Sequence, residues 1–312
     1  VAVGANSLDA NTTGDDNTAI GDNALGANTT ASNNTAVGAN TLLANTTGAT
    51  LVAVGSGALA SNTTASSNVA MGAYALTANT TGDNNTGLGH NVLTANTTGA
   101  SNVAVGQGAL DANTTADNNT SIGARTLTSN TTGHSNVAVG KDALYANTEG
   151  FHNIAIGMQA MDAMTGGDYN TALGGGALGS DTTGAGSTAI GYAALTAQNS
   201  TTSADMFNVA VGREAGAAVT TGVHNTIVGA KAGDALTTSN SNVAVGYEAL
   251  STATTYSENT AIGYRALKVN AGGYYNTSVG HESMLANTDG TNNVAVGHDA
   301  LKANTTGASN IA

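Results

Sequence analysis

Six histidines are the residues of this 312-residue chain best suited to bind a metal ion. They are His90, His134, His152, His224, His281 and His298. A zinc site needs three or four ligands that converge at short range. No two of these histidines are close together in sequence with a carboxylate, and all fall at turn positions of the repeat described below. We expect exposed turn residues and no metal site.

Acidic residues beside glycine or asparagine superficially suggest calcium loops, as at Asp15, Asp16, Asp83 and Asp117. Neither the spaced acidic loop of an EF-hand nor the glycine-rich nonapeptide of a calcium-binding β-roll is present. The interpretation we favour is a solvated acidic surface.

Serine and threonine are abundant, but none differs from its equivalents elsewhere in the chain. Catalysis needs a unique, asymmetric arrangement of groups, and no phosphate-binding glycine motif opens a helix here. We therefore expect no enzyme activity, no catalytic residue and no cofactor.

Asn-Thr-Thr sequences form N-glycosylation sequons that recur along the chain. Their asparagines are Asn11, Asn28, Asn45, Asn62, Asn79, Asn96, Asn113, Asn130 and Asn304. A row of glycans is one interpretation of this pattern. A hydrogen-bonded turn is the stronger one, because asparagine and the following glycine suit left-handed backbone.

A repeated unit positions all of these residues, and Asn293–Ser309 is one copy. Numbered from its asparagine, position five is glycine in every copy, at intervals of 17 residues except for 21 between Gly191 and Gly212. Such a period is typical of a solenoid, whose coils bury apolar surface against their neighbours. We predict one solenoid domain over residues 1–312, with about 18 coils and one longer coil at 187–207. The extra residues, among Asn199–Phe207, should form a protruding loop, and the chain is expected to be a fragment of a longer fibre.

Composition excludes several classes of protein. With 42 glycines, no proline, no tryptophan and two phenylalanines, the chain cannot build an ordinary globular core. A formal net charge of −13 argues against nucleic acid as a partner. No apolar stretch approaches the roughly 18 residues of a membrane span, so we expect no membrane insertion in this segment.

Position three is usually alanine between β-branched or apolar residues at two and four, which predicts a short strand. The A-L-x-A sequence at positions eight to eleven is assigned to a second strand. We predict an interior of position four and the leucine at position nine. The fold class is therefore all-β, a parallel β-roll or β-solenoid of 17-residue coils. Asparagines at positions one and twelve should stack as hydrogen-bonded ladders.

Small residues at positions three and eight suggest a second face that permits close approach of another chain. The alanines of this predicted face include Ala19, Ala24, Ala36, Ala53, Ala58, Ala104 and Ala109. We expect them to pack against identical chains about a three-fold axis, giving a homotrimer.

The N-[TV]-A-[VI]-G-x-x-A-L-x-A sequence of units such as Asn68–Asn84 and Asn102–Asn118 resembles the repeats of trimeric autotransporter adhesin heads. Similar arrays occur in phage tail-fibre-domain proteins. The resemblance covers essentially the whole chain, although each coil has about three more residues. It implies a left-handed parallel β-roll, three chains side by side, and binding surfaces displayed outside the cell or virion.

Together these features predict a structural fibre protein, an extracellular, cell-surface or virion-associated rod that reaches a receptor. Exposed aromatic residues on turns, including Tyr74, Tyr192, Tyr247, Tyr264 and Phe151, make a cell-surface receptor or glycan a further partner. Scattered singly, they are also compatible with no function at all. One alternative is a self-assembling surface or matrix filament. Another is an ice-binding solenoid, although Thr80 and Thr81 should point to opposite sides and leave only one threonine row.

Overall fold

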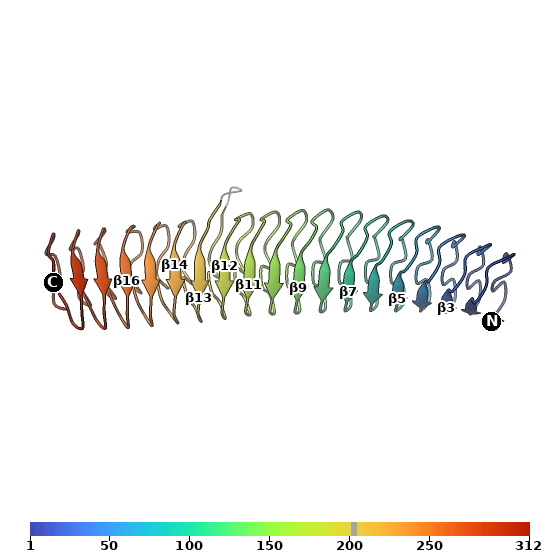
Figure 1. Ribbon diagram of the computed structural model, residues 1–312, viewed down its shortest axis with the longest axis horizontal. Helices are drawn as coiled ribbons and strands as arrows, with labels where there is room; N and C mark the ends of the chain where they lie inside the picture. The colour runs from blue at the N-terminus through green and yellow to red at the C-terminus, as the bar shows by residue number, and fades with distance from the viewer. Residues whose placement is uncertain (201–204) are drawn as a thin grey trace. The chain divides into compact units, whose positions relative to one another are not determined.

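The computed structural model describes residues 1–200 and 205–312, and within them the chain is all-β, with no helix. The backbone groups into two compact units, Val1–Asn153 and Ile154–Ala312. Each unit is a parallel β-solenoid with one short strand per coil (Figure 1). The predicted fold class is confirmed, while the single domain over 1–312 stays a prediction.

The first unit contains nine described strands. They are β1 (Ala2–Val3), β2 (Thr18–Ile20), β3 (Thr35–Val37), β4 (Val52–Val54), β5 (Val69–Met71), β6 (Thr86–Leu88), β7 (Val103–Val105), β8 (Thr120–Ile122) and β9 (Val137–Val139). Neighbours pair in parallel and in register, so that Ala104 of β7 lies beside Ser121 of β8.

The described strands of the second unit also number nine. They are β10 (Ile154–Ile156), β11 (Thr171–Leu173), β12 (Thr188–Ile190), β13 (Val209–Val211), β14 (Thr226–Val228), β15 (Val243–Val245), β16 (Thr260–Ile262), β17 (Thr277–Val279) and β18 (Val294–Val296). The longer coil keeps the register, because Thr188 of β12 pairs with Val209 of β13. The loop predicted among Asn199–Phe207 lies in part outside the described residues.

The middle residue of each three-residue strand points into the coil, which corrects the predicted interior. Ala104 is fully buried, whereas Val103 and Val105 on either side of it are only half-buried. Position four is therefore on the outside. The cause is lack of room inside the coil. In the preceding coil glycine, Gly87, replaces the alanine of position three. A methyl group added there would lie 3.1 Å from Val92 Cγ1 and 3.2 Å from Leu76 Cδ1.

One coil pair shows directly that positions three and nine face each other in the interior. Glycine replaces the leucine of position nine at Gly216 and Gly233. In the same pair of coils Ile227 replaces the alanine of position three and is fully buried. A Cβ added at Gly216 would lie 2.9 Å from Ile227 Cδ1. The isoleucine thus fills the volume that the missing leucines leave, as close packing requires.

Positions three and eight also meet inside the coil. Where Ser121 occupies position three, position eight is Thr126, and their hydroxyl oxygens lie 2.5 Å apart. Where Ser278 occupies position three, position eight is Ser283, whose backbone oxygen accepts from the Ser278 hydroxyl at 2.8 Å. In these two coils the buried hydroxyls are paired, and the single buried hydroxyl of Thr41 donates to the Gly55 carbonyl at 2.8 Å, because a buried hydroxyl needs a partner.

The predicted second strand is wrong, because the segment at positions eight to eleven is a series of turns. Leu110 has a φ of +52°. The Asn113 amide donates to the Leu110 carbonyl at 3.2 Å, which closes a turn. The Leu110 amide in turn donates to the Thr126 carbonyl of the next coil at 3.1 Å. In a strand, successive side chains point to opposite faces. A left-handed residue breaks this pattern, so the side chains at positions eight and nine are both buried.

The two predicted asparagine ladders are confirmed. At position twelve, Asn96 Nδ2 donates to Asn79 Oδ1 at 2.8 Å, and Asn96 Oδ1 accepts from Asn113 Nδ2 at 2.8 Å. At position one, Asn102 Oδ1 accepts from the Asn119 backbone amide at 3.0 Å, and Asn102 Nδ2 donates to Asn85 Oδ1 at 3.1 Å. These side chains are fully buried. Each ladder therefore satisfies the polar groups of the turns where apolar packing is thin.

Six successive coils of the second unit replace the position-twelve asparagine. The substituting residues are Met164, Asp181, Gln198, Val219, Leu236 and Ala253, all fully buried. Gln198 Nε2 donates to Asp181 Oδ2 at 2.6 Å and so continues a polar contact between two of these coils. Elsewhere in this stretch, apolar side chains take the place of the ladder.

Truncation of one ladder member tests this account. Asn96→Ala should lower the free energy of unfolding by about 3 kcal/mol, because Asn79 Oδ1 and the Gly99 carbonyl lose a buried donor and Asn113 Nδ2 loses its acceptor. Thr98→Ala, two residues away on the exposed side of the turn, is the control. Denaturant unfolding followed by circular dichroism measures both, and equal losses would contradict a structural role for the ladder.

Candidate functional site

The outward face of the sheet is the most extensive candidate contact surface in each unit. It consists of the side chains at positions two and four, which flank the buried middle residue of every three-residue strand. Position four carries valine, isoleucine, leucine or methionine throughout. Met71 is 44% exposed and Leu173 is 46% exposed. These side chains form an apolar row along each unit.

Position two adds a parallel row of valine, isoleucine and threonine on the same face. Residues two apart on a strand lie about 6.6 Å apart, so the rows are adjacent. No charged residue occupies either position in any coil. Soluble monomers rarely expose contiguous apolar surface of more than a few hundred Å². The sheet face, defined as these two rows, therefore has the character of an interaction surface.

The alanine face predicted for chain association is not available. Its alanines are all fully buried inside the coils; they are Ala19, Ala24, Ala36, Ala53, Ala58, Ala104 and Ala109. They contact their own chain because the coil has room for only a methyl group opposite the leucine. A contact between chains has to use another surface.

Four aromatic rings stack at position six of consecutive coils near the end of the second unit. The ring centroids of Tyr247 and Tyr264 are 5.7 Å apart, those of Tyr264 and His281 5.0 Å, and those of His281 and His298 4.9 Å. The planes are nearly parallel, at 15°, 17° and 7°. Residues that look scattered in sequence thus form one exposed aromatic ladder.

Charged residues at positions seven and ten lie beside this ladder. Glu248 accepts from Lys268 Nζ at 2.5 Å and from Arg265 Nε at 2.9 Å. The hydrogen bond from Lys268, with smaller contributions from Tyr247 and Arg265, lowers the pKa of Glu248 to about 2. Being near the surface and screened by solvent, such ion pairs contribute little to stability. They do fix the positions of charges along the ladder.

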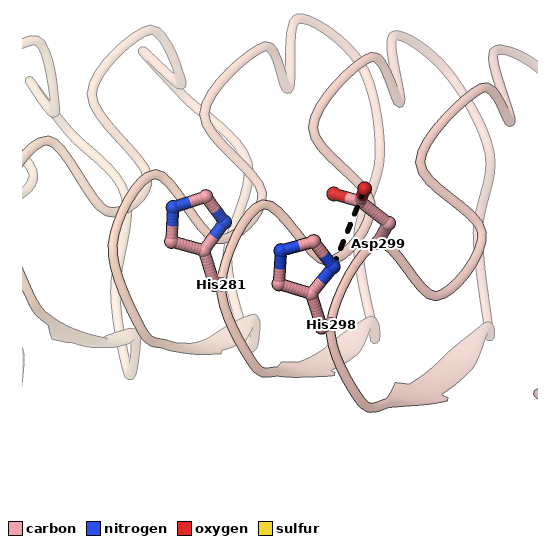
Figure 2. A group of neighbouring side chains, drawn as sticks. All are labelled: His281, His298 and Asp299. Carbon is pink, nitrogen blue, oxygen red and sulfur yellow. Dashed lines mark ion pairs between the residues drawn. The ribbon is translucent and has the colours of Figure 1, made fainter.

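All six histidines are exposed, as predicted. The period of 17 residues nevertheless places His281 and His298 side by side in adjacent coils. Asp299 joins them, and one possible ligand atom from each of the three lies within 4.8 Å of the others (Figure 2). The cluster was not predicted from the sequence, because only histidines close together along the chain were considered. The signal that could have found it is that His281 and His298 both occupy position six of adjacent coils.

The acidic residues considered for calcium have structural roles where they are bonded. Asp83 Oδ1 accepts from the Ser66 amide at 2.6 Å, and Asp117 Oδ1 accepts from the Ala100 amide at 2.7 Å. Each carboxylate thus satisfies a backbone group of the preceding coil. This arrangement explains why acidic residues are tolerated at position sixteen.

The Asn-Thr-Thr turns are poor glycan acceptors in the folded chain. Their asparagines from Asn28 to Asn130 are fully buried in the ladder. Of the two threonines, Thr80 is half-buried and donates its hydroxyl to the Thr97 carbonyl at 3.0 Å, while Thr81 is exposed. One threonine row therefore faces solvent along these turns.

Comparison with known proteins adds no family assignment: no protein-family model matches the chain, and no curated protein matches it significantly. Among the described residues, no helix is long and apolar enough to cross a membrane.

Proposed function

We propose that this chain is a segment of a structural fibre in which three identical chains associate side by side through the sheet face. The observation that carries the proposal is the exposed apolar surface at positions two and four, present in both units. The β-solenoid supplies a regular scaffold, and the resemblance of the repeat to adhesin and tail-fibre arrays supports an extracellular or virion-associated rod.

An identical chain is the partner that fits this surface. Parallel strands repeat about every 4.8 Å, and another copy presents apolar rows with the same period. Side chains can therefore interlock coil after coil. The formal net charge of −13 would make two copies repel each other, but the charged residues all lie outside positions two and four. Association buries apolar surface without bringing carboxylates into the contact.

A rod of this kind displays its turns to the surroundings. The exposed tyrosines at position six, with Tyr192 63% exposed, are suited to contact a cell-surface glycan or protein receptor. The chain itself is proposed to be structural and not catalytic.

Charges placed on the sheet face test the proposal. The unmodified chain should show three times its mass of 30.2 kDa in light scattering. The triple variant Val37→Lys, Val54→Lys, Met71→Lys places one ammonium on each of three adjacent strands, and it should be monomeric at micromolar concentration. Burying unpaired charges in the contact would cost more than the apolar contact contributes.

The matched control carries the same three lysines in the same coils at exposed position-fourteen threonines, as Thr47→Lys, Thr64→Lys and Thr81→Lys. It should remain trimeric. A monomeric unmodified chain, or dissociation of both triple variants, would contradict the sheet-face trimer. A monomer that also produces thermal hysteresis in freezing assays would favour the ice-binding alternative, and open-ended filaments would favour the matrix protein.

A further inference from the structure

We propose that His281, His298 and Asp299 form a binding site for a divalent transition-metal ion, with Zn²⁺ as the ion best suited to it. The site is independent of the proposed fibre function. His281 and His298 occupy position six of adjacent coils, and their rings are stacked at a centroid distance of 4.9 Å and an angle of 7°. Figure 2 shows both imidazoles on the same side of the two coils.

Asp299 supplies the third ligand from the residue next to His298. His298 Nδ1 and Asp299 Oδ2 are 3.3 Å apart. Two ligands of a tetrahedral zinc ion, each at about 2.0–2.1 Å from the metal, are separated by about 3.4 Å. This pair therefore already has the spacing of two ligands. His281 completes the set once its exposed ring turns to point a nitrogen lone pair, which lies in the ring plane, at the ion; the three possible ligand atoms already lie within 4.8 Å of one another.

Lys302 and Glu282 hold the carboxylate in place. Lys302 Nζ lies 3.0 Å from Asp299 Oδ1 and 2.6 Å from Glu282 Oε2. Oδ1 is thus engaged by the ammonium, whereas Oδ2 faces the imidazole and is the oxygen that can bind metal. Glu282, Asp299 and Lys302 carry a combined charge of −1, which favours a cation despite the lysine. Groups that orient a ligand in this way are typical supports of metal sites.

The ligand set selects the class of metal. Two imidazoles and one carboxylate suit zinc, copper, nickel or cobalt, whereas calcium and magnesium prefer oxygen ligands. Three protein ligands leave a fourth position to water. A bound ion would bridge the coils that begin at Asn276 and Asn293 and would resist their separation.

Calorimetric titration of the full chain with Zn²⁺ tests the site. One ion per chain should bind to the unmodified protein. Asp299→Asn should weaken binding at least about tenfold, and the double variant His281→Asn, His298→Asn should remove it. Circular dichroism should show the same fold for all variants, because the substituted side chains are exposed or half-buried.

The control is the double variant His134→Asn, His152→Asn, which removes another pair of neighbouring imidazoles. Their centroids are 5.6 Å apart, but among the described residues no carboxylate joins them in a group of three possible ligands. Zinc affinity should be unchanged in this variant. Absence of binding to the unmodified chain, or equal loss in both double variants, would overturn the proposal.

A second measurement reports on the coordination itself. Co²⁺ bound in place of Zn²⁺ should show the intense visible absorption of a tetrahedral site in the unmodified chain and not in Asp299→Asn. Hydrogen exchange should slow in residues 276–312 when Zn²⁺ is added. Slower exchange throughout the chain, without the cobalt absorption, would mean nonspecific binding and would contradict this site.

Discussion

Gly106→Ala should lower the free energy of unfolding by about 4 kcal/mol, although it adds a single methyl group. Gly106 closes β7 with a φ of +126°, where a side chain is strained. A Cβ at this residue would lie 2.5 Å from the carbonyl oxygen of Gly123 in the next coil. Coils stacked at strand spacing cannot move apart locally, so the collision has to break hydrogen bonds between them.

The second glycine of the same turn provides the control. Gly108 has a φ of +65°, and a Cβ there would have no atom within 4 Å. Gly108→Ala should therefore cost only about 1 kcal/mol, the conformational cost of a left-handed residue. Denaturant unfolding gives both values, and hydrogen exchange should locate the Gly106→Ala effect in the coils on either side. Similar costs for the two variants would show that the close contact does not decide the identity of position five.

Leu110→Asp should lower the free energy of unfolding by about 4 kcal/mol, because it places an unpaired charge in the interior. Leu110 is fully buried, in the layer that also contains Ala104 and Ala109. A carboxylate there would have no basic partner, because positions three, eight and nine of the two neighbouring coils carry no charged residue; they hold Gly87, Val92, Leu93, Ser121, Thr126 and Leu127. The measurements are the free energy of unfolding and the melting temperature.

Gln107→Asp introduces the same carboxylate three residues earlier and should be nearly silent. Gln107 is exposed in the turn that follows β7. Surface changes of this kind usually alter stability by less than about 0.5 kcal/mol. Comparable tolerance of aspartate at both residues would show that the inward orientation of position nine is wrong.

Much of the fold was readable from the amino-acid sequence because a strict period constrains every coil in the same way. Glycine at position five, with a β-branched residue, a small residue and an apolar residue before it, predicted the strand that the structure shows, although the second strand predicted at positions eight to eleven is a series of turns. Asparagine at positions one and twelve predicted the ladders. Both conclusions depend only on what identical neighbours can do when they stack, which does not require knowledge of the coil's cross-section.

Which side of the strand faces inward was decided by the tertiary structure. Alternation shows that positions two and four share a face, but it does not say which face is buried. The larger residues were predicted inside on general grounds, yet a coil this small has room only for alanine opposite leucine. One sequence feature does indicate the buried face: where Gly216 and Gly233 replace the leucine of position nine, Ile227 replaces the alanine of position three. Residues that compensate for each other's volume in this way have to be in contact.

The turn at Leu110 and the cluster at His281 depended on structure for different reasons. Left-handed backbone is rare for leucine, so no local preference predicts it, and it is stabilised by hydrogen bonds between coils. His281 and His298 are 17 residues apart, a distance that excludes a local motif but that stacking reduces to one strand spacing. The sequence by itself determined the period and the residue at each position of the coil. Only the tertiary structure decided inside from outside, because that depends on how much volume one closed coil can hold.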